Sequence, residues 1–381
     1  MGSRKARLAA VLLLLSALSM AQASTPEEAI ALEQQGKLEE AAQAWKAVTD
    51  SNPGDAAAFA SLGVVRSRQQ KYPDAAAAYR RALALDPKLP GIDLNLGLAE
   101  FKQGHFPAAV AALRAALDAD PSSTQVQTLL GLSYYGAKNF ALASRYLEPV
   151  ARADPANGGL QQTLAQSCLW AKKYDCALEQ FQKLMEQDPD SAATHVLTGE
   201  ALDGLRRTAE AIAEFETAAK IAPREPNLHF GLGYLLWKSQ QYDRATQEFK
   251  RELSLDPTHA QALAYLGDIE WKNNHPDAAL SLFKRAMQGN QDLRIVYIDL
   301  GALYLQQNRY REAQAALIRA VALNPDLPDA HYQLGRLYQA IGNTAEAEKE
   351  LSKVRELHEN AEESLAGKMP ASRVPLNPAE H

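Results

Sequence analysis

The first motif that could do chemistry is a glycine-rich stretch that ends in lysine. Gly131-Leu-Ser-Tyr-Tyr-Gly136-Ala-Lys138 comes within one residue of the phosphate-binding loop, in which backbone N–H groups and a lysine hold phosphate oxygens. That loop must follow a β-strand, and no strand pattern precedes Gly131. Glycine also recurs at the phase of Gly131 along the chain. We therefore interpret this glycine as a helix-packing residue and predict no nucleotide site.

Histidines at a common phase are the second such feature, because imidazole is a frequent metal ligand. His195 and His229 are 34 residues apart, and His331 recurs at the same phase. Neighbouring helix axes lie about 8–10 Å apart, so we expect partly exposed packing histidines. No H-E-x-x-H zinc helix occurs, and the acidic residues are scattered as solvated helix faces require. We predict no metal, no cofactor and no enzymatic activity.

The two cysteines, Cys168 and Cys176, are eight residues apart. A disulfide between them is feasible near the turn of a helical hairpin, where packed helices come close enough for the required Cα separation. Two small, buried thiols are the alternative. A metal pair is disfavoured because no histidine lies near them in sequence. Both the bridged and the unbridged form stay open on the sequence alone.

Three residue types repeat every 34 residues, and this period indicates the elements that position all these side chains. Proline ends a helix, and small residues allow two helices to cross closely while large apolar residues at i, i+3 and i+4 fill the space. The prolines are Pro53, Pro87, Pro121, Pro155, Pro189, Pro223, Pro257 and Pro325. The glycines are Gly63, Gly97, Gly131, Gly199, Gly233, Gly267, Gly301 and Gly335. The alanines are Ala41, Ala75, Ala109, Ala143, Ala177, Ala211, Ala245, Ala279, Ala313 and Ala347.

This pattern resembles the tetratricopeptide repeat family, whose L-G-x2-Y, A-x3-F and P residues recur at the same period. Two repeats illustrate it, with leucine at the F position: Leu130, Gly131, Tyr134, Ala143, Leu147 and Pro155, and Leu300, Gly301, Tyr304, Ala313, Leu317 and Pro325. The resemblance implies an all-α fold, a right-handed superhelical solenoid of ten helix-turn-helix repeats from 22–55 to 328–361. Ala29 and Glu359 depart from the pattern, which is typical of capping repeats.

Residues 1–23 have the composition of a secretory signal peptide. Arg4, Lys5 and Arg7 precede an apolar run, and Ala21-Gln22-Ala23 supplies a small-residue cleavage site. We therefore expect a bacterial protein exported to the periplasm or the medium, with the solenoid at 24–361. An uncleaved anchor is the alternative, but the apolar run is too short to span a bilayer. We expect no membrane span in the mature form.

Charge argues against nucleic acid as a partner. Three of the 40 Lys and Arg residues lie in residues 1–23, which hold no acidic residue, so cleavage leaves 37 basic and 46 acidic residues and a net charge of −9. Nucleic-acid binding rests on clustered Lys and Arg. A protein or peptide partner remains, on the surface that the stacked repeats create.

The first helices of the repeats line the concave side in this family, which implies a groove. An exposed apolar strip on such a face is typical of a binding site, and we predict that it holds an apolar segment of another protein. Rings that merely pack against neighbouring helices are the alternative. The apolar groove residues are Phe230, Tyr234, Trp237, Trp271, Ile298 and Tyr332, edged by the acidic Glu200, Asp203 and Asp268.

Two specialised functions of the family find no support on this face. Members that clamp a chaperone's terminal carboxylate place Lys and Asn where this chain has residues such as Leu94 and Leu98. Members fused to sugar transferases carry an asparagine ladder, of which this chain has only Asn95. The remaining alternatives are a structural spacer or an accessory subunit of a cell-envelope assembly or enzyme complex, bound through the convex face or the ends.

Residues 362–381 form a tail whose prolines oppose helix formation, so we expect a disordered segment. The tail contains Arg373-Val374-Pro375-Leu376, a basic residue beside apolar ones. Such a segment complements an apolar groove with an acidic edge. Self-docking of the tail as a plug is therefore the alternative to disorder.

Overall fold

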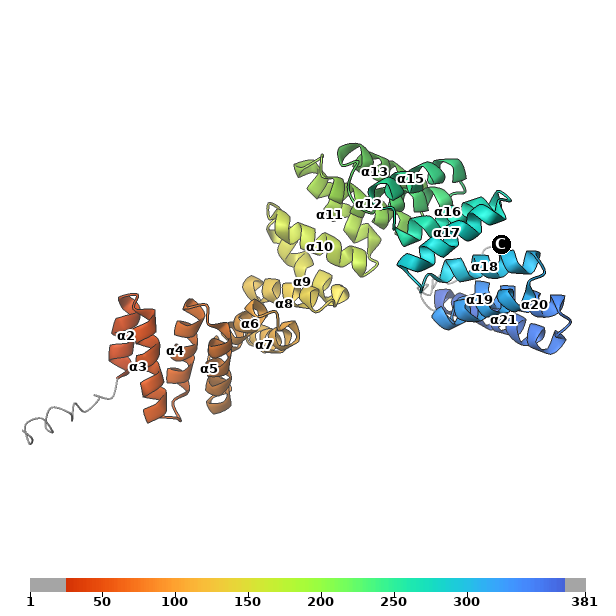
Figure 1. The fold of residues 1–381 in the computed structure, drawn as a ribbon. Coiled ribbons are helices and arrows are strands. Elements are labelled where there is room, and N and C mark those ends of the chain that lie inside the picture. Colours follow the sequence, from red (N-terminus) through yellow and green to blue (C-terminus); the bar gives the residue numbers. More distant parts are fainter. Residues whose placement is uncertain (1–24, 367–381) are drawn as a thin grey trace, which may run out of the picture. The chain divides into compact units, whose positions relative to one another are not determined.

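The computed structural model describes residues 25–366, and this range contains 20 α-helices and no strand. The helices form ten antiparallel pairs, so the all-α repeat fold is confirmed (Figure 1). The chain divides into two compact units, with the boundary after Pro189. In the first unit the pairs are α2 (Pro26–Gln34) with α3 (Leu38–Ser51), α4 (Ala56–Arg68) with α5 (Tyr72–Leu85), α6 (Ile92–Lys102) with α7 (Phe106–Ala119), α8 (Thr124–Gly136) with α9 (Phe140–Ala153), and α10 (Gly158–Trp170) with α11 (Tyr174–Gln187).

The second unit repeats this arrangement, with the even-numbered first helix of each pair packed against the odd-numbered second helix. Its pairs are α12 (Ala192–Gly204) with α13 (Thr208–Ile221), α14 (Leu228–Lys238) with α15 (Tyr242–Leu255), α16 (Ala260–Lys272) with α17 (Pro276–Gly289), α18 (Arg294–Gln306) with α19 (Tyr310–Leu323), and α20 (Pro328–Ala340) with α21 (Thr344–Ala366).

The small-residue series lies where the two helices of a pair cross. Nine of its alanines are fully buried, and Ala347 is 3% exposed. Gly233 shows why glycine is needed, because a Cβ atom there would lie 2.6 Å from the ring of Phe249. Gly131 is buried against Leu147 in the same way, so it packs a helix and does not form a phosphate loop.

The turn inside each pair places one residue in the left-handed region, at a position that repeats every 34 residues. Glycine adopts this conformation without a steric cost, and asparagine tolerates it. Only three of the ten residues are glycine, and Lys138 of the glycine-rich stretch is another. The ten are Gly36, Gln70, Gly104, Lys138, Lys172, Arg206, Gln240, Asn274, Asn308 and Gly342.

Two first helices, α6 and α14, have 11 residues where most others have 13. Each follows a proline and a residue of positive φ, Pro90-Gly91 with φ 75° and Pro226-Asn227 with φ 65°. Proline followed by glycine or asparagine is the signature of a type II turn, which delays the start of the helix. In the second unit, α14, α16, α18 and α20 pack on one another in succession, whereas α12 and α14 are less closely packed. The shortened α14 thus leaves space beside α12.

Cys168 of α10 and Cys176 of α11 form a disulfide, with their Cα atoms 5.8 Å apart. It crosses the turn between the two helices of one repeat, the position at which the sequence allowed a bridge. The chain contains no further cysteine that could compete for these sulfurs.

We expect the oxidised protein to show no free thiol after denaturation without reductant, by titration with a thiol reagent. Breaking the bridge with Cys176→Ser should cost about 2–3 kcal/mol, because the cross-link closes a short loop in the unfolded chain. A titration that finds two thiols in the oxidised protein would rule the bridge out.

The last helix is longer than the repeat period predicts. Helix α21 runs to Ala366, so residues 362–366, which we expected in the tail, are helical. Their Glu, Ser, Leu and Ala residues tolerate a helix, and the first proline of the tail comes only at Pro370. Residues 367–381 and the expected signal peptide lie outside the described residues.

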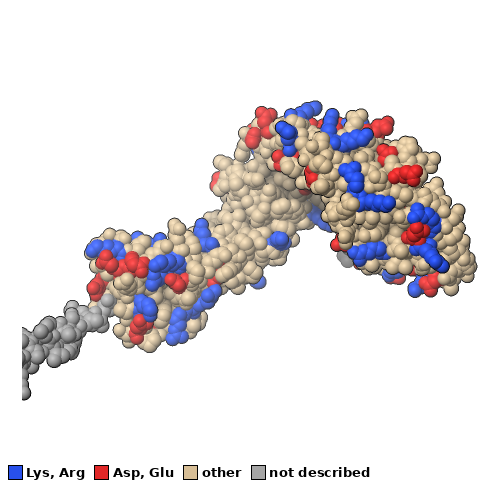
Figure 2. Space-filling view, in the orientation of Figure 1, with Lys and Arg blue, Asp and Glu red and all other residues tan. Residues whose placement is uncertain are grey.

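Acidic and basic side chains are interspersed on the face drawn in Figure 2. Within residues 25–366, no helix is both long and apolar enough to cross a membrane.

Candidate functional site

A pocket lies between the first helices α12 and α14. It has a volume of about 540 Å³. The short α14 creates it, because the Pro226-Asn227 turn occupies the place where another helical turn would start. The pocket is lined mainly by apolar side chains, with two carboxylates: Ala192, Ala193, Val196, Leu197, Glu200, Phe215, Glu225, Pro226, Asn227, Leu228, Phe230 and Gly231.

Phe230 connects this pocket to a set of contacting rings. The aromatic cluster consists of Phe230, Tyr234, Trp237, Phe249 and Tyr265. Tyr265 is its centre, because its ring centroid lies 4.8 to 6.0 Å from those of the other four. The structure therefore brings together the predicted Phe230, Tyr234 and Trp237, all half-buried. Sequence reasoning missed Tyr265, although its place next to Leu266 of the first-helix core could have indicated it.

Glu252 positions the start of α14. Asn227 caps this helix from the left-handed region, and its side chain makes no capping hydrogen bond. The carboxylate of Glu252, which is 1% exposed, instead accepts from the N–H of Asn227 at 3.0 Å and from the N–H of Phe230 at 3.1 Å. Negative charge is favourable at a helix N-terminus. A residue 22 positions away in sequence thus holds Phe230 at the pocket wall.

The acidic edge differs from the prediction. Asp268 is 1% exposed and accepts a hydrogen bond from the Trp237 indole Nε1 at 2.5 Å. It also forms an ion pair with Lys272. Asp203 accepts two hydrogen bonds from Lys238, at 2.7 and 3.0 Å. Both charges are therefore paired inside the protein, Asp203 with a lysine one repeat later and Asp268 with a lysine one turn later on the same helix. Glu200 alone is exposed, at the pocket rim, and nearby atoms raise its pKa by desolvation.

The remaining predicted groove residues lie apart from the aromatic cluster. Trp271 packs against the core of α16 to α18, and its indole Nε1 donates to Gln306 at 3.4 Å. Among the described residues it makes no ring contact with the cluster. Ile298 is half-buried and Tyr332 is 49% exposed. Their role in binding stays a prediction.

A buried carboxyl group, Asp299 of α18, lies behind this surface. It is 7% exposed, and its Oδ2 atom has no hydrogen-bond partner among the residues described. Burial raises its pKa well above the usual range, and the charge of Asp268 raises it further, while Lys272 acts in the opposite direction. Sequence reasoning gave no sign of this group.

We expect Asp299→Asn to stabilise the second unit at neutral pH by about 1–3 kcal/mol, because it removes a buried carboxyl group whose ionisation is opposed by burial and which ionises freely only in the unfolded chain. The pKa is raised in the folded state, so the native carboxyl costs nothing below its unfolded pKa of about 3.9 and an increasing amount as the pH rises through the folded pKa. The free energy of unfolding that Asp299→Asn adds should therefore be near zero in acid and grow with pH. Denaturant unfolding at several pH values tests this, with the exposed Asp326→Asn as control. A gain in stability that does not change with pH would contradict the raised pKa of Asp299 in the folded state.

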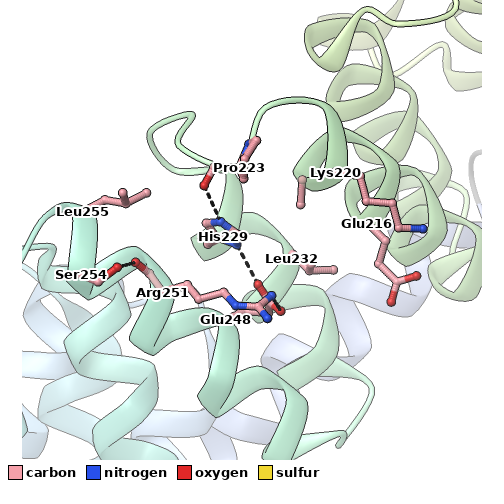
Figure 3. A pocket seen from close by; sticks show the side chains of 10 residues that line it. Glu216, Lys220, Pro223, His229, Leu232, Glu248, Arg251, Ser254 and Leu255 are labelled. Carbon is pink, nitrogen blue, oxygen red and sulfur yellow. Dashed lines mark hydrogen bonds and ion pairs between the residues drawn. The ribbon is translucent and has the colours of Figure 1, made fainter.

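A second pocket, of about 640 Å³, lies on the side of the second helices α13 and α15 (Figure 3). At its floor, His229 hydrogen-bonds through Nδ1 to Glu248 at 2.7 Å and through Nε2 to the Pro223 carbonyl at 3.0 Å. Arg251 also pairs with Glu248. The polar groups of this pocket thus largely satisfy one another.

The same contacts account for the histidines of common phase. His331 bonds to Glu350 at 2.5 Å and to the Pro325 carbonyl at 3.0 Å, and His195 bonds to Glu214 at 2.6 Å. His229 and His331 are 5% and 7% exposed, so our expectation of partly exposed histidines was wrong for these two. A carboxylate and a carbonyl compensate their burial. A glutamate follows each of the three histidines by 19 residues, and this spacing could have indicated the pairing.

Comparison with known proteins agrees with this architecture. One family model, described as tetratricopeptide repeat, matches residues 27–90 and 230–292. A second model of the same description matches residues 68–132, 134–199, 270–326 and 304–366, which is more than half of the chain. A search of curated proteins gave no significant match.

A solved structure that aligns with most of the chain has the same fold. The hetero-tetramer Cut9-Hcn1 of the APC/C is 15% identical, with a TM-score of 0.51, over 87% of this chain and 80% of that chain. The structure described as MamA MSR-1 C2 is 27% identical over 43% of this chain and 95% of that chain, with a TM-score of 0.39. YrrB, whose structure is described as a TPR protein with an unusual peptide-binding site, is 20% identical over 49% of this chain and 97% of its own, with a TM-score of 0.36. On the family models and the repeat fold together, the chain belongs to the tetratricopeptide repeat family.

Proposed function

We propose that the protein is an exported interaction scaffold, without enzymatic activity of its own, that binds an apolar peptide segment of a partner protein at the first-helix face of the second unit. The family is one of protein-binding scaffolds, and the described residues offer a surface suited to that role. The observation that carries the proposal is the pocket between α12 and α14, which opens beside the aromatic cluster.

This pocket has the composition of a binding site. It is mainly apolar, and its volume falls in the range of about 300–1,000 Å³ typical of ligand pockets. Phe230 belongs to both the pocket and the cluster, so a side chain inserted into the pocket would contact a rigid aromatic wall. Rings of this kind act as anchors in protein interfaces.

Export is supported by two observations of different kinds. Residues 1–23 have the pattern of a signal peptide, and the Cys168–Cys176 disulfide is of a type that persists in oxidising compartments. Mass measurement of the N-terminus after expression in a bacterium tests this part, and we expect the mature chain to start at Ser24. A full-length N-terminus on cytoplasmic protein would reject export.

Capture of partners from a cell-envelope extract tests the binding surface. We expect Ala193→Trp to abolish capture, because residue 193 is exposed at the pocket and an indole there would fill it. The matched control is Ala219→Trp, which places the same ring in the pocket on the second-helix side.

Loss of capture with Ala219→Trp alone would assign the function to the convex face and reject the proposal. Self-docking of the tail, the alternative to disorder, adds one further test. Deleting residues 367–381 should raise partner affinity if the tail competes for the pocket, and an unchanged affinity would leave the tail without this role.

A further inference from the structure

The charges around the α12–α14 pocket are all of one sign. Glu200 and Glu225 line it, and no Lys, Arg or His is among its lining residues. Glu200 comes from the middle of α12, and Glu225 comes from the turn that precedes α14. The two carboxylates therefore reach the pocket from its two walls.

These carboxylates contrast with the acidic groups near them. Asp203, one turn after Glu200, is bound by Lys238, and Asp268 is bound by Lys272 and Trp237. Within the described residues, neither Glu200 nor Glu225 has a side-chain hydrogen bond or ion pair. Arg224 is adjacent to Glu225 in sequence but does not line the pocket.

An unpaired carboxylate beside an apolar pocket favours a ligand that supplies a cation. Nearby atoms already desolvate Glu200, so the water lost on binding costs less than for a fully hydrated group. Complementary charge also selects among partners, because an acidic segment would place like charges together.

We infer that the pocket takes an aliphatic or aromatic side chain from an extended peptide segment with a lysine or arginine within two residues of that anchor. The apolar side chain enters between α12 and α14, and the cation lies at the rim against Glu200 and Glu225. This inference rests on the proposed function, to which it adds the chemistry of the partner.

A random dodecapeptide library displayed on phage, selected on the full chain, tests the inference without knowledge of the natural partner. We expect enriched sequences to carry an apolar residue with Lys or Arg within two positions, at least about threefold above the frequency in the unselected library. The selected consensus is then synthesised as a free peptide and its Kd measured.

Two variants test whether the carboxylate of Glu200 contributes to binding of the consensus peptide. Glu200→Gln should weaken the consensus peptide about three- to tenfold, whereas Glu186→Gln, which neutralises an exposed glutamate of α11, should leave Kd unchanged. A peptide with Gln in place of its cation should bind both the wild type and Glu200→Gln with the same reduced affinity.

The two levels of the proposal fail differently. Enrichment of apolar sequences without a basic residue, lost in Ala193→Trp, would overturn the inference about charge and leave the apolar site standing. Enrichment that Ala193→Trp does not change would overturn both, because binding would then lie elsewhere.

Discussion

Replacement of Phe249 by alanine should lower the free energy of unfolding of the second unit by about 3–5 kcal/mol, the usual cost of removing a fully buried aromatic ring. Phe249 is 0% exposed on α15 and fills the space above Gly233. Its ring also contacts Phe230 and Tyr265, so the cavity would open beneath the aromatic cluster. Stability in repeat arrays is shared between neighbours, and we therefore expect the loss to be concentrated in α14 to α16.

Hydrogen exchange on the intact chain measures this loss helix by helix, since one midpoint of unfolding does not describe a two-unit protein. Ile318→Ala is the control, because that side chain is 50% exposed and should lose little protection. Equal loss of protection in Phe249→Ala and Ile318→Ala would contradict the packing described for α14 and α15.

Removal of the exposed side of the aromatic cluster should have the largest effect on binding. Phe230→Ala with Tyr234→Ala is expected to weaken the binding of a captured partner by at least about thirtyfold, because even one aromatic anchor at the centre of an interface contributes about 2 kcal/mol or more. Both rings are half-buried, so part of the surface of each is available to a partner. Isothermal titration calorimetry with the purified partner gives the change in Kd.

Trp271→Ala is the comparison, since Trp271 packs on the neighbouring core outside the cluster. Circular dichroism should show equal helix content in all variants. If Trp271→Ala weakens binding as strongly as the double variant, the binding surface extends over α16, as the sequence first indicated. Wild-type affinity in the double variant would remove the cluster from the site.

The sequence was sufficient for the fold because the positions that matter are periodic. The alanine at the helix crossing recurs in all ten repeats, while the glycine under a large apolar side chain and the proline at the repeat end each recur in eight. The bounds of the helices follow from these choices, since proline and the buried small residues fix where each helix ends and crosses.

The site was predicted only in part, because its properties depend on contacts between repeats. Phe230, Tyr234 and Trp237 lie on one helix face and could be grouped by spacing. The hydrogen bond from Trp237 to the buried Asp268 could not, since it requires the offset between α14 and α16. The capping of α14 by Glu252 depends likewise on the path of the Pro226-Asn227 turn. A departure from the repeat pattern, Pro226-Asn227 before a short helix, could have indicated the pocket but was not used.

The disulfide within the α10–α11 pair has a consequence for how the first unit loses structure. Stability in a repeat array is a sum of the stabilities of single repeats and of the contacts between neighbours, so one repeat can lose its structure locally. The repeat that holds Cys168 and Cys176 is the last one of the first unit. When this repeat frays, its two helices stay tethered across their turn, so they re-form by a local search instead of a search over the whole chain. In an oxidising environment, the cross-link thus speeds the re-formation of this repeat, and reduction would remove that effect.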